Sequence, residues 1–376
     1  MDKNVVVLGI VSFFTDLASS MVNTILPLFI VYILNEGVDK LGYVLAIATF
    51  LSYALRVVFG YFSDKYGIVK PFVVTGYLIS AISKPLLYFS HTWKSVAFLR
   101  GTERIGKAIR SATKDTLLSA YSHSHSGKTF GFHKMLDVAG EMTGALIVFL
   151  ILMFIGKSEE IFRLIFAFTI IPGIISVFLV IFFVKDVKKE KISKNIDFKK
   201  DKEVIKFLFF YFGFLIFAFN DSFFVIKAKE SGFTFEMIPL LIIVYNLTQT
   251  LLSYFLGVKI EKEGYKKILL ISFVFGILSV IAMKMSYIVL GFVFLGIFTV
   301  GSLNAIRSYI SDNAFNKSTV YGFFYTGVAI SASLASLIIG KLWQNYGENF
   351  AYVYSITGMI FVLLFYLKDG YVRAYH

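Results

Sequence analysis

Long apolar stretches separated by short polar segments run through the whole chain. An α-helix needs about 20 mostly apolar residues to cross the hydrocarbon core of a bilayer, and most of these stretches reach that length. The pattern therefore predicts membrane-spanning helices, six before the charged segment 185–203 and six after it. The predicted spans cover residues 5–34, 41–62, 70–90, 93–119, 128–155, 161–184, 204–227, 236–258, 268–284, 287–310, 320–340 and 349–367.

This arrangement predicts an all-α integral membrane protein with twelve transmembrane helices. We expect an N-terminal six-helix bundle over residues 1–184, a cytoplasmic charged linker over 185–203 and a C-terminal six-helix bundle over 204–376. A membrane β-barrel is excluded, because its strands are about 10 residues long and alternate in polarity. The first stretch, 5–34, is too long for the core of a signal peptide, so we expect it to remain as the first span.

Polar positions recur in the same order in the two halves of the chain. The matched positions are Gly60 with Gly257, Asp64 with Glu261, Lys65 with Lys262, Gly67 with Gly264, Arg110 with Arg307, Asp115 with Asp312, Asp16 with Asp221, and Gly131-Phe132 with Gly322-Phe323. Matches in the correct order indicate a duplicated six-helix unit, which is a common plan of transporters. We therefore expect two pseudo-symmetric bundles.

The composition supports a membrane protein and narrows its chemistry. Hydrophobic residues make up 57% of the chain and charged residues only 16%, against about 25% charged in soluble domains. The absence of cysteine excludes disulfides, thiolate nucleophiles and cysteine-based zinc sites. No phosphate-binding glycine loop and no catalytic constellation stands out, so we expect neither an enzyme nor an ATP-driven pump, and no cofactor or metal site.

The formal net charge of +13 does not indicate a nucleic-acid partner. The basic residues lie mainly in the loops between apolar stretches, where the positive-inside rule places them on the cytoplasmic side. Counting lysines and arginines on alternate loops favours a multi-pass protein with both termini in the cytoplasm.

The segment Gly60-Tyr-Phe-Ser-Asp64-Lys65-Tyr-Gly67 resembles the signature loop of the major facilitator superfamily. That loop has a glycine, three residues, an aspartate, a basic residue, one further residue and a glycine. Here the basic residue that normally follows at once is displaced to Lys70. The resemblance covers essentially the whole chain and implies the twelve-helix fold of that superfamily and secondary transport by alternating access, with a substrate site at mid-membrane between the two halves.

A narrower likeness is to a group of prokaryotic permeases within that superfamily, which implies the plasma membrane of a prokaryote. The residues that carry it are Arg104, Gly106, Lys107, Arg110, Lys114, Asp115, Gly131, Phe132, His133 and Asp137.

The signature loop predicts a conformational latch on the cytoplasmic side. Asp64 at a helix edge can accept hydrogen bonds from the exposed N–H groups at the start of a neighbouring helix. The superfamily resemblance implies that this neighbour is the eleventh span. The residues of the predicted latch are Gly60, Asp64, Lys65, Gly67 and Glu261. The alternative is an ordinary positive-inside turn without a gating role.

Ionisable residues inside predicted spans are the main candidates for a functional site, because they are costly in a membrane. The fourth span carries cations at steps of three and four residues, and the fifth carries carboxylates on one face. These residues are Arg100, Arg104, Lys107, Arg110, Asp137 and Glu141. Matching depths across the hairpin predicts Asp137 near Lys107 and Glu141 near Arg104, with Arg100 and Arg110 as surplus cations. A wholly structural ion network is the alternative.

Three further charges complete the predicted substrate or ion pathway. Asp16 lies in the first span, Asp221 in the middle or outer part of the seventh, and Arg307 on the tenth. A carboxylate inside a membrane can bind a proton or another cation. The alternatives are that Asp16 pairs with Arg56 or Arg110 and that Asp221 faces external water. Lys84 in the third span is expected to reach outward to the interface.

The sequence predicts a proton-coupled secondary transporter for a small solute, with a preference for an anionic metabolite because of the surplus cations. An exporter of amphipathic drugs, or of cations or metal ions through Asp16 and Asp221, is the nearest alternative. A non-transporting membrane sensor or assembly factor is the alternative from another class. The expected partners are a small-molecule substrate, membrane lipid and protons, and we expect a monomer.

Overall fold

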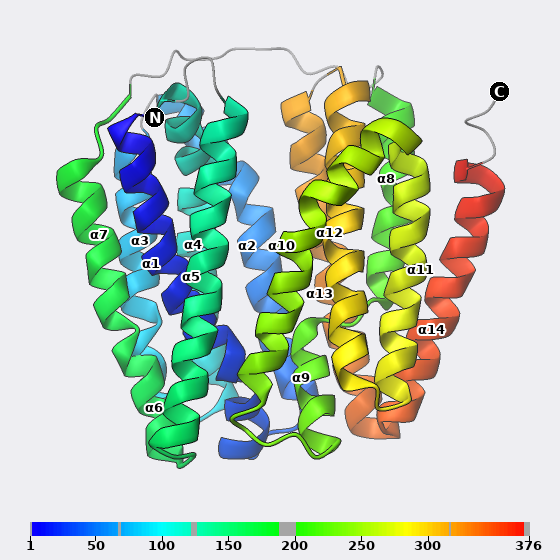
Figure 1. Ribbon diagram of the computed structural model, residues 1–376, viewed down its shortest axis with the longest axis horizontal. Helices are drawn as coiled ribbons and strands as arrows, with labels where there is room; N and C mark the ends of the chain where they lie inside the picture. The colour runs from blue at the N-terminus through cyan, green and yellow to red at the C-terminus, as the bar shows by residue number, and fades with distance from the viewer. Residues whose placement is uncertain (1, 67–68, 122–125, 188–200, 316, 372–376) are drawn as a thin grey trace. The chain divides into compact units, whose positions relative to one another are not determined.

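The computed structural model describes residues 2–66, 69–121, 126–187, 201–315 and 317–371 of the 376-residue chain. All regular elements in these ranges are helices (Figure 1). Within them, 11 helical segments are long and apolar enough to cross a membrane. Helix α4 (Trp93–Tyr121) is also long enough to cross a membrane, with 29 residues, but it carries too many charged residues to be counted among these 11. The predicted all-α fold with twelve transmembrane helices is confirmed.

The helices of the first half are α1 (Lys3–Leu28), η1 (Phe29–Ile33), α2 (Val38–Tyr66), α3 (Lys70–Ser83), η2 (Pro85–Phe89), α4 (Trp93–Tyr121), α5 (Ser126–Phe154), α6 (Glu159–Phe168) and α7 (Ile170–Phe183). Those of the second half are α8 (Lys202–Phe217), α9 (Asp221–Glu230), α10 (Ile238–Glu263), α11 (Tyr265–Lys284), α12 (Ile288–Asn313), α13 (Lys317–Tyr346), α14 (Glu348–Phe365) and η4 (Tyr366–Tyr371).

Several spans that the sequence predicts as single helices are interrupted. Pro85 opens the 3₁₀ turn η2 directly after α3, because proline cannot donate the next helical hydrogen bond. The seventh span stops at Phe217 and restarts as α9, where the Asn220 side chain accepts a hydrogen bond from the Ser222 backbone N–H at 3.0 Å. Asp221 therefore lies in the first turn of a new helix.

One compact unit comprises Met1–Glu36, Ile47–Lys194 and Phe235–Leu240. In it α1 packs against α5 and α7, and α3 packs against α4 and α7. Helices α3 and α4 touch at two glycines, since a Cβ on Gly76 would lie 2.6 Å from the Gly106 carbonyl oxygen and a Cβ on Gly106 would lie 2.8 Å from that of Gly76. Small residues at such crossings let membrane helices approach closely.

The other compact unit comprises Gly37–Ala46, Asn195–Thr234 and Leu241–His376. In it α8 packs against α13 and α14, and α11 packs against α12 and α14. The same pairing of helices recurs in the first unit, as the repeat in the sequence predicts. Two short segments, 37–46 and 235–240, belong to the unit that is formed mainly by the other half of the chain.

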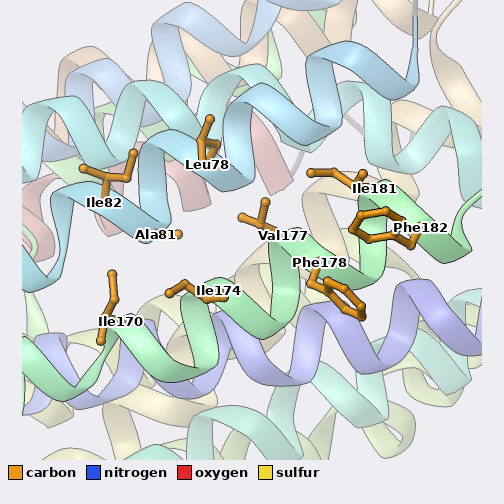
Figure 2. Close-up of a pocket in the computed structure, with 9 residues that line it drawn as sticks. All are labelled: Leu78, Ala81, Ile82, Ile170, Ile174, Val177, Phe178, Ile181 and Phe182. Atoms are coloured by element: carbon orange, nitrogen blue, oxygen red, sulfur yellow. The ribbon is translucent and has the colours of Figure 1, made fainter.

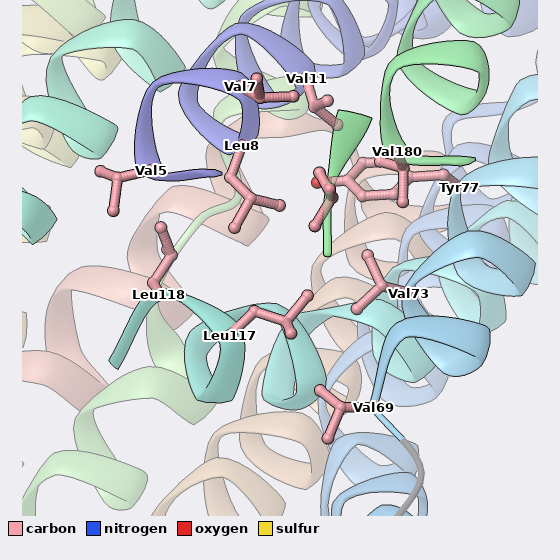
Figure 3. Packing of buried hydrophobic residues seen from close by; sticks show 11 residues of the cluster. Val5, Val7, Leu8, Val11, Val69, Val73, Tyr77, Leu117, Leu118 and Val180 are labelled. Carbon is pink, nitrogen blue, oxygen red and sulfur yellow. The ribbon is translucent and has the colours of Figure 1, made fainter. Parts of the chain in front are cut away.

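An aliphatic core closes one end of the first unit (Figure 3). It joins α1, α3, α4 and α7 through side chains that are at most 9% exposed. The labelled core residues are Val5, Val7, Leu8, Val11, Val69, Val73, Tyr77, Leu117, Leu118 and Val180. Tyr77 also contacts Arg110, so this core adjoins the charged residues described next.

Candidate functional site

A row of charged side chains lies between α1, α3, α4 and α5 of the first unit. The cations are Lys84, Arg100, Arg104, Lys107, Arg110 and Lys114, and the carboxylates are Asp16, Glu103, Asp137 and Glu141. Six cations thus face four carboxylates in this set. Lys84, Arg100, Glu103 and Arg110 are each at most 5% exposed, so the row reaches the protein interior. Buried charges in a membrane protein mark a pathway or a structural pair, and the contacts distinguish the two.

Glu103 joins two arginines at one end of the row. Its Oε2 atom lies 3.1 Å from Nη1 of Arg100 and 3.1 Å from Nε of Arg104. Both guanidinium groups also donate to Oδ1 of Asn23 on α1, Arg100 at 2.7 Å and Arg104 at 3.2 Å. Oε1 of Glu103 and Nε of Arg100 are buried without a hydrogen-bond partner in the described chain. Arg100 therefore has an ion-pair partner, which the sequence did not predict, but it shares that single carboxylate with Arg104.

The position of Lys84 contradicts the prediction that this side chain reaches outward to the membrane interface. Its side chain is 2% exposed, and its Nζ donates to the Thr15 carbonyl oxygen of α1 at 3.3 Å. It does not reach outward to the membrane interface. The reason is the end of α3, because Lys84 stands between Ser83, the last residue of that helix, and Pro85, which opens η2.

Arg110 lies against α3 one turn beyond the Gly76–Gly106 contact. Its Nη1 donates to Oγ of Ser80 at 2.7 Å, and its guanidinium lies 4.8 Å from the centroid of the Tyr77 ring. No carboxylate forms an ion pair with Arg110 in the described residues, in agreement with its prediction as a surplus cation. The proposed Asp16–Arg110 pair is not formed.

Asp16 and Lys107 lie in the middle of the row. They interact electrostatically, but neither makes a hydrogen bond or an ion pair within the described part of the chain. Glu141 also interacts electrostatically with Asp16 and Lys107. Depth matching predicted Glu141 next to Arg104, whereas Glu141 interacts with Lys107, which lies one helical turn further along α4.

Asp137 takes part in a separate contact. Its Oδ1 lies 3.3 Å from Nδ1 of His133, which is one turn earlier on α5. The strongest outside charge acting on Asp137 is Lys114 and not Lys107. Lys114 lies two turns of α4 after Lys107, so the predicted pairing of Asp137 with Lys107 is wrong.

The candidates in the second unit are not gathered in this way. Asp221, in the first turn of α9, accepts from the Ser222 backbone N–H at 3.0 Å. Arg307 is exposed on α12 and donates to the Tyr325 hydroxyl at 3.4 Å. The interior of this unit is aromatic, with Phe214 stacked on Phe273 at 4.1 Å between ring centroids.

The predicted latch is described only in part. Gly60 is half-buried in α2, and Gly67 lies outside the described residues. Asp64 and Lys65 end α2, but their side chains also lie outside the description. Glu261 is exposed near the end of α10, where Glu263 and not Glu261 pairs with Lys267 at 2.9 Å. The latch stays a prediction.

A groove of about 240 Å³ runs between α3 and α7 (Figure 2). Its lining is entirely apolar, with residues Leu78, Ala81, Ile82, Ile170, Ile174, Val177, Phe178, Ile181 and Phe182. A solute site needs a few convergent polar groups in addition to apolar walls. This groove is therefore not a candidate solute site.

The sequence analysis missed Ser12, Asn23, Ser80, Lys84 and Glu103 as site residues. A signal was present for α1, because Ser12, Asp16 and Asn23 lie four and then seven residues apart, on one helical face. Ser80 and Lys84 on α3 are likewise four residues apart. Polar residues that recur with a helical period inside an apolar span would have indicated which faces of α1 and α3 point toward the charged row.

Comparison with known proteins agrees with this architecture. The sequence profile of the Major Facilitator Superfamily matches residues 8–238 and 206–373. An uncharacterised MFS-type transporter of Methanocaldococcus jannaschii is 31% identical over 360 residues, covering 92% of this chain and 89% of that protein. An uncharacterised protein of Mycobacterium tuberculosis is 33% identical over 118 residues, covering 31% of this chain and 29% of that protein.

Solved structures share the fold at low sequence identity. The nucleoside transporter NupG has a TM-score of 0.79 at 14% identity and covers 98% of this chain and 99% of its own. A D-xylose-proton symporter has a TM-score of 0.73 at 13% identity, with coverage of 96% and 95%. The superfamily profile, the archaeal relative and the shared fold lead to one conclusion: this chain belongs to the Major Facilitator Superfamily and is a multi-pass membrane transporter, not an enzyme.

Proposed function

We propose that this protein is a proton-coupled secondary transporter that moves a small anionic solute by alternating access. The observation that carries the anion preference is the convergence of Arg100 and Arg104 on the side-chain oxygen of Asn23. These two guanidinium groups share only one carboxylate, that of Glu103. One end of the row therefore carries more positive charge than its protein partners neutralise.

The geometry of this arginine pair suits a carboxylate or phosphate group. Guanidinium groups bind such anions through two parallel N–H donors, which gives strength and orientation. Asn23 is exposed, and its neutral oxygen accepts from both arginines at the point where a solute oxyanion would give a stronger hydrogen bond. A solute that displaces Asn23 would gain two charge-assisted contacts.

The remaining predicted residues take supporting roles in this proposal. Asp16, Lys107, Asp137, Glu141 and Arg110 continue the pathway along α1, α4 and α5, and Asp221 and Arg307 contribute from the second half. Gly60, Asp64, Lys65, Gly67 and Glu261 form the cytoplasmic latch. A shared fold with a D-xylose-proton symporter supports proton coupling as a property this architecture can carry.

The proposal includes the setting of the protein. It places a monomer in a prokaryotic plasma membrane, with both termini and the linker 185–203 in the cytoplasm, between six-helix bundles 1–184 and 204–376. The excess of lysine and arginine in alternate loops supports that orientation. Membrane lipid, protons and one small solute are the proposed partners.

A thermal-shift screen of the detergent-purified protein tests the proposal. Probes are small carboxylates and phosphates, inorganic cations and amphipathic amines, because a ligand of the folded state raises the melting temperature by mass action. We expect stabilisation by an anion, lost in Arg104→Ala and kept in Lys94→Ala. Lys94 is an exposed cation on the same helix and serves as the matched control. Stabilisation by amines or cations alone would replace the anion proposal with export of such compounds.

A further inference from the structure

Four polar side chains form a second row in the first unit, separate from the arginine pair. Nζ of Lys114 on α4 donates to Oγ of Ser12 on α1 at 3.1 Å. That Oγ lies 2.8 Å from Nε2 of His133 on α5, and Nδ1 of His133 lies 3.3 Å from Oδ1 of Asp137. Ser12 is 1% exposed and His133 is 5% exposed. The row thus connects three helices through buried groups.

The donors and acceptors of this row have a fixed direction. An ammonium group can only donate, so Ser12 accepts from Lys114 and keeps its own hydrogen for Nε2 of His133. A neutral imidazole has one N–H and one bare nitrogen. Since Nδ1 faces a carboxylate, which only accepts, neutral His133 carries its hydrogen on Nδ1. Every donor then points from Lys114 toward Asp137 without conflict.

The end of the row lacks a well-aligned donor. Oδ1 of Asp137 is buried and receives no properly directed hydrogen bond from the described residues, although Nδ1 of His133 is its neighbour. A buried acceptor without a donor is costly, and strengthening the donor opposite relieves that cost. An imidazolium would do so, because its positive charge strengthens the Nδ1–H contact with the Asp137 carboxylate.

Binding one proton changes this row in a defined way. The proton attaches to Nε2 of His133, which then donates to Ser12. The Ser12 oxygen accepts from both Lys114 and His133 through its two lone pairs, and its own hydrogen turns away. No covalent bond of the protein breaks, and the added charge stays on the imidazolium beside Asp137.

The charges around His133 come from each helix that packs on it. Helix α1 contributes Asp16, one turn from Ser12, and α4 contributes Lys114. On α5 itself, the Asp137 carboxylate lies beside Nδ1 of His133, and Lys134 is the next residue along the chain. The contacts of His133 therefore connect α5 to α1 through Ser12, and to α4 through Ser12 and Lys114.

We propose that Ser12, Lys114, His133 and Asp137 form a proton-binding site, with the proton carried by His133 and Asp137 as its counter-ion. The inference rests on the proposed proton-coupled transport and names the site of that proton. Because the row connects α1, α4 and α5, loading and release of the proton change the contacts that hold these helices together.

Nitrogen NMR of the full-length protein, labelled with ¹⁵N-histidine in lipid nanodiscs, tests this site with the proton itself as the ligand. The chain has five histidines, and His133→Gln identifies the signal of interest. We expect the Nδ1–H tautomer at the alkaline end and imidazolium once the proton is bound. Ser12→Ala removes the hydroxyl that donates to Nε2, so the neutral form of His133 in this variant becomes a mixture of the two tautomers.

Ser19→Ala is the matched control, because Ser19 lies on the same helix but donates to the Thr15 carbonyl oxygen outside this row. Should Ser12→Ala fail to fold, Asp137→Asn replaces it and is expected to abolish the preference for Nδ1–H. An Nε2–H tautomer in the parent, no imidazolium signal from His133 on acidification, or equal spectra for the Ser12 and Ser19 variants would overturn the site. These signals need no solute, so a failed anion screen would reject the proposed substrate and leave this result standing.

Discussion

Helices α4 and α12 have the same place in two similarly paired units, yet only α4 carries a charged row. The constant spacing of the sequence repeat aligns Arg100, Glu103, Arg104, Lys107, Arg110 and Lys114 with Ile297, Val300, Gly301, Asn304, Arg307 and Ser311. The partner helices differ likewise, since Ser80 and Lys84 of α3 correspond to Ile277 and Ile281 of α11. Of the six cations in the row, five on α4 and Lys84 on α3, only Arg110 has a cationic counterpart, which is Arg307.

This difference bears on why the charges exist. Helix α11 packs on α12 and α14 as α3 packs on α4 and α7, so the fold forms without the charged row. An ion network that served only to hold helices together would be needed in both copies. Its restriction to the first unit favours a chemical role there, while aromatic contacts such as Phe207 with Tyr309 at 4.2 Å fill the second unit.

The largest effect is expected for Glu103→Gln. This change leaves Arg100 and Arg104 without their shared carboxylate, and it removes a negative charge that interacts electrostatically with Lys84. Removing one member of a buried ion cluster costs about 3–5 kcal/mol of folding free energy, because the remaining charges are uncompensated. The loss is measured by comparing the free energies of unfolding of the parent and the variant, both purified in detergent. Val300→Ala, at the matching position of α12, should cost only about 1 kcal/mol; equal losses would contradict the contrast between the units.

Arg104→Lys should weaken anion binding about tenfold, which corresponds to about 1.4 kcal/mol. Lysine keeps the charge but loses the planar pair of donors that a carboxylate or phosphate engages. Arg307→Lys on α12 should change the affinity less than threefold, because Arg307 is exposed and contacts only tyrosines within the described chain. Titration with the stabilising anion gives the dissociation constants of the two variants, and these are compared with that of the parent. Matching losses would show that both repeats bind the solute.

Sequence patterns predicted the fold better than the site, for a physical reason. Apolar length and loop charge depend on the bilayer, which acts on each span separately, so the outer limits of the spans agree with the helix ends to within about six residues. Contacts between spans depend on rotation and depth of neighbouring helices. Asp137 faces Lys114 instead of Lys107, and Lys84 turns inward at Pro85, and neither follows from spacing along one helix.

Arg110→Ala should lower stability by about 1–2 kcal/mol, through loss of the hydrogen bond to Ser80 and of the stacking on Tyr77. Its repeat mate Arg307→Ala should stay within about 0.5 kcal/mol, as is usual for surface changes. Thermal unfolding of the two variants in the same detergent compares them directly. A cost at Arg307 as large as that at Arg110 would mean that the second unit depends on its cation equally.

The smallest effect is expected where the second unit does hold a partly buried ion pair. Nζ of Lys227 on α9 lies 2.8 Å from both carboxylate oxygens of Glu348 on α14. The Glu348 side chain is 32% exposed, so water can solvate it when its partner is removed. Lys227→Met keeps the apolar stem over Tyr352 and should cost less than about 1 kcal/mol.

Salt sharpens this last test, because ions screen exposed pairs far more than buried ones. The free energies of unfolding of the parent and of Lys227→Met should therefore converge as the salt concentration is raised. The loss of unfolding free energy in Glu103→Gln should persist. A loss above about 2 kcal/mol for Lys227→Met that salt does not reduce would identify a buried charge network in the second unit as well. The restriction of buried charge chemistry to α4 and its neighbours would then no longer hold, and the argument that the charged row of the first unit has a chemical role would lose its support.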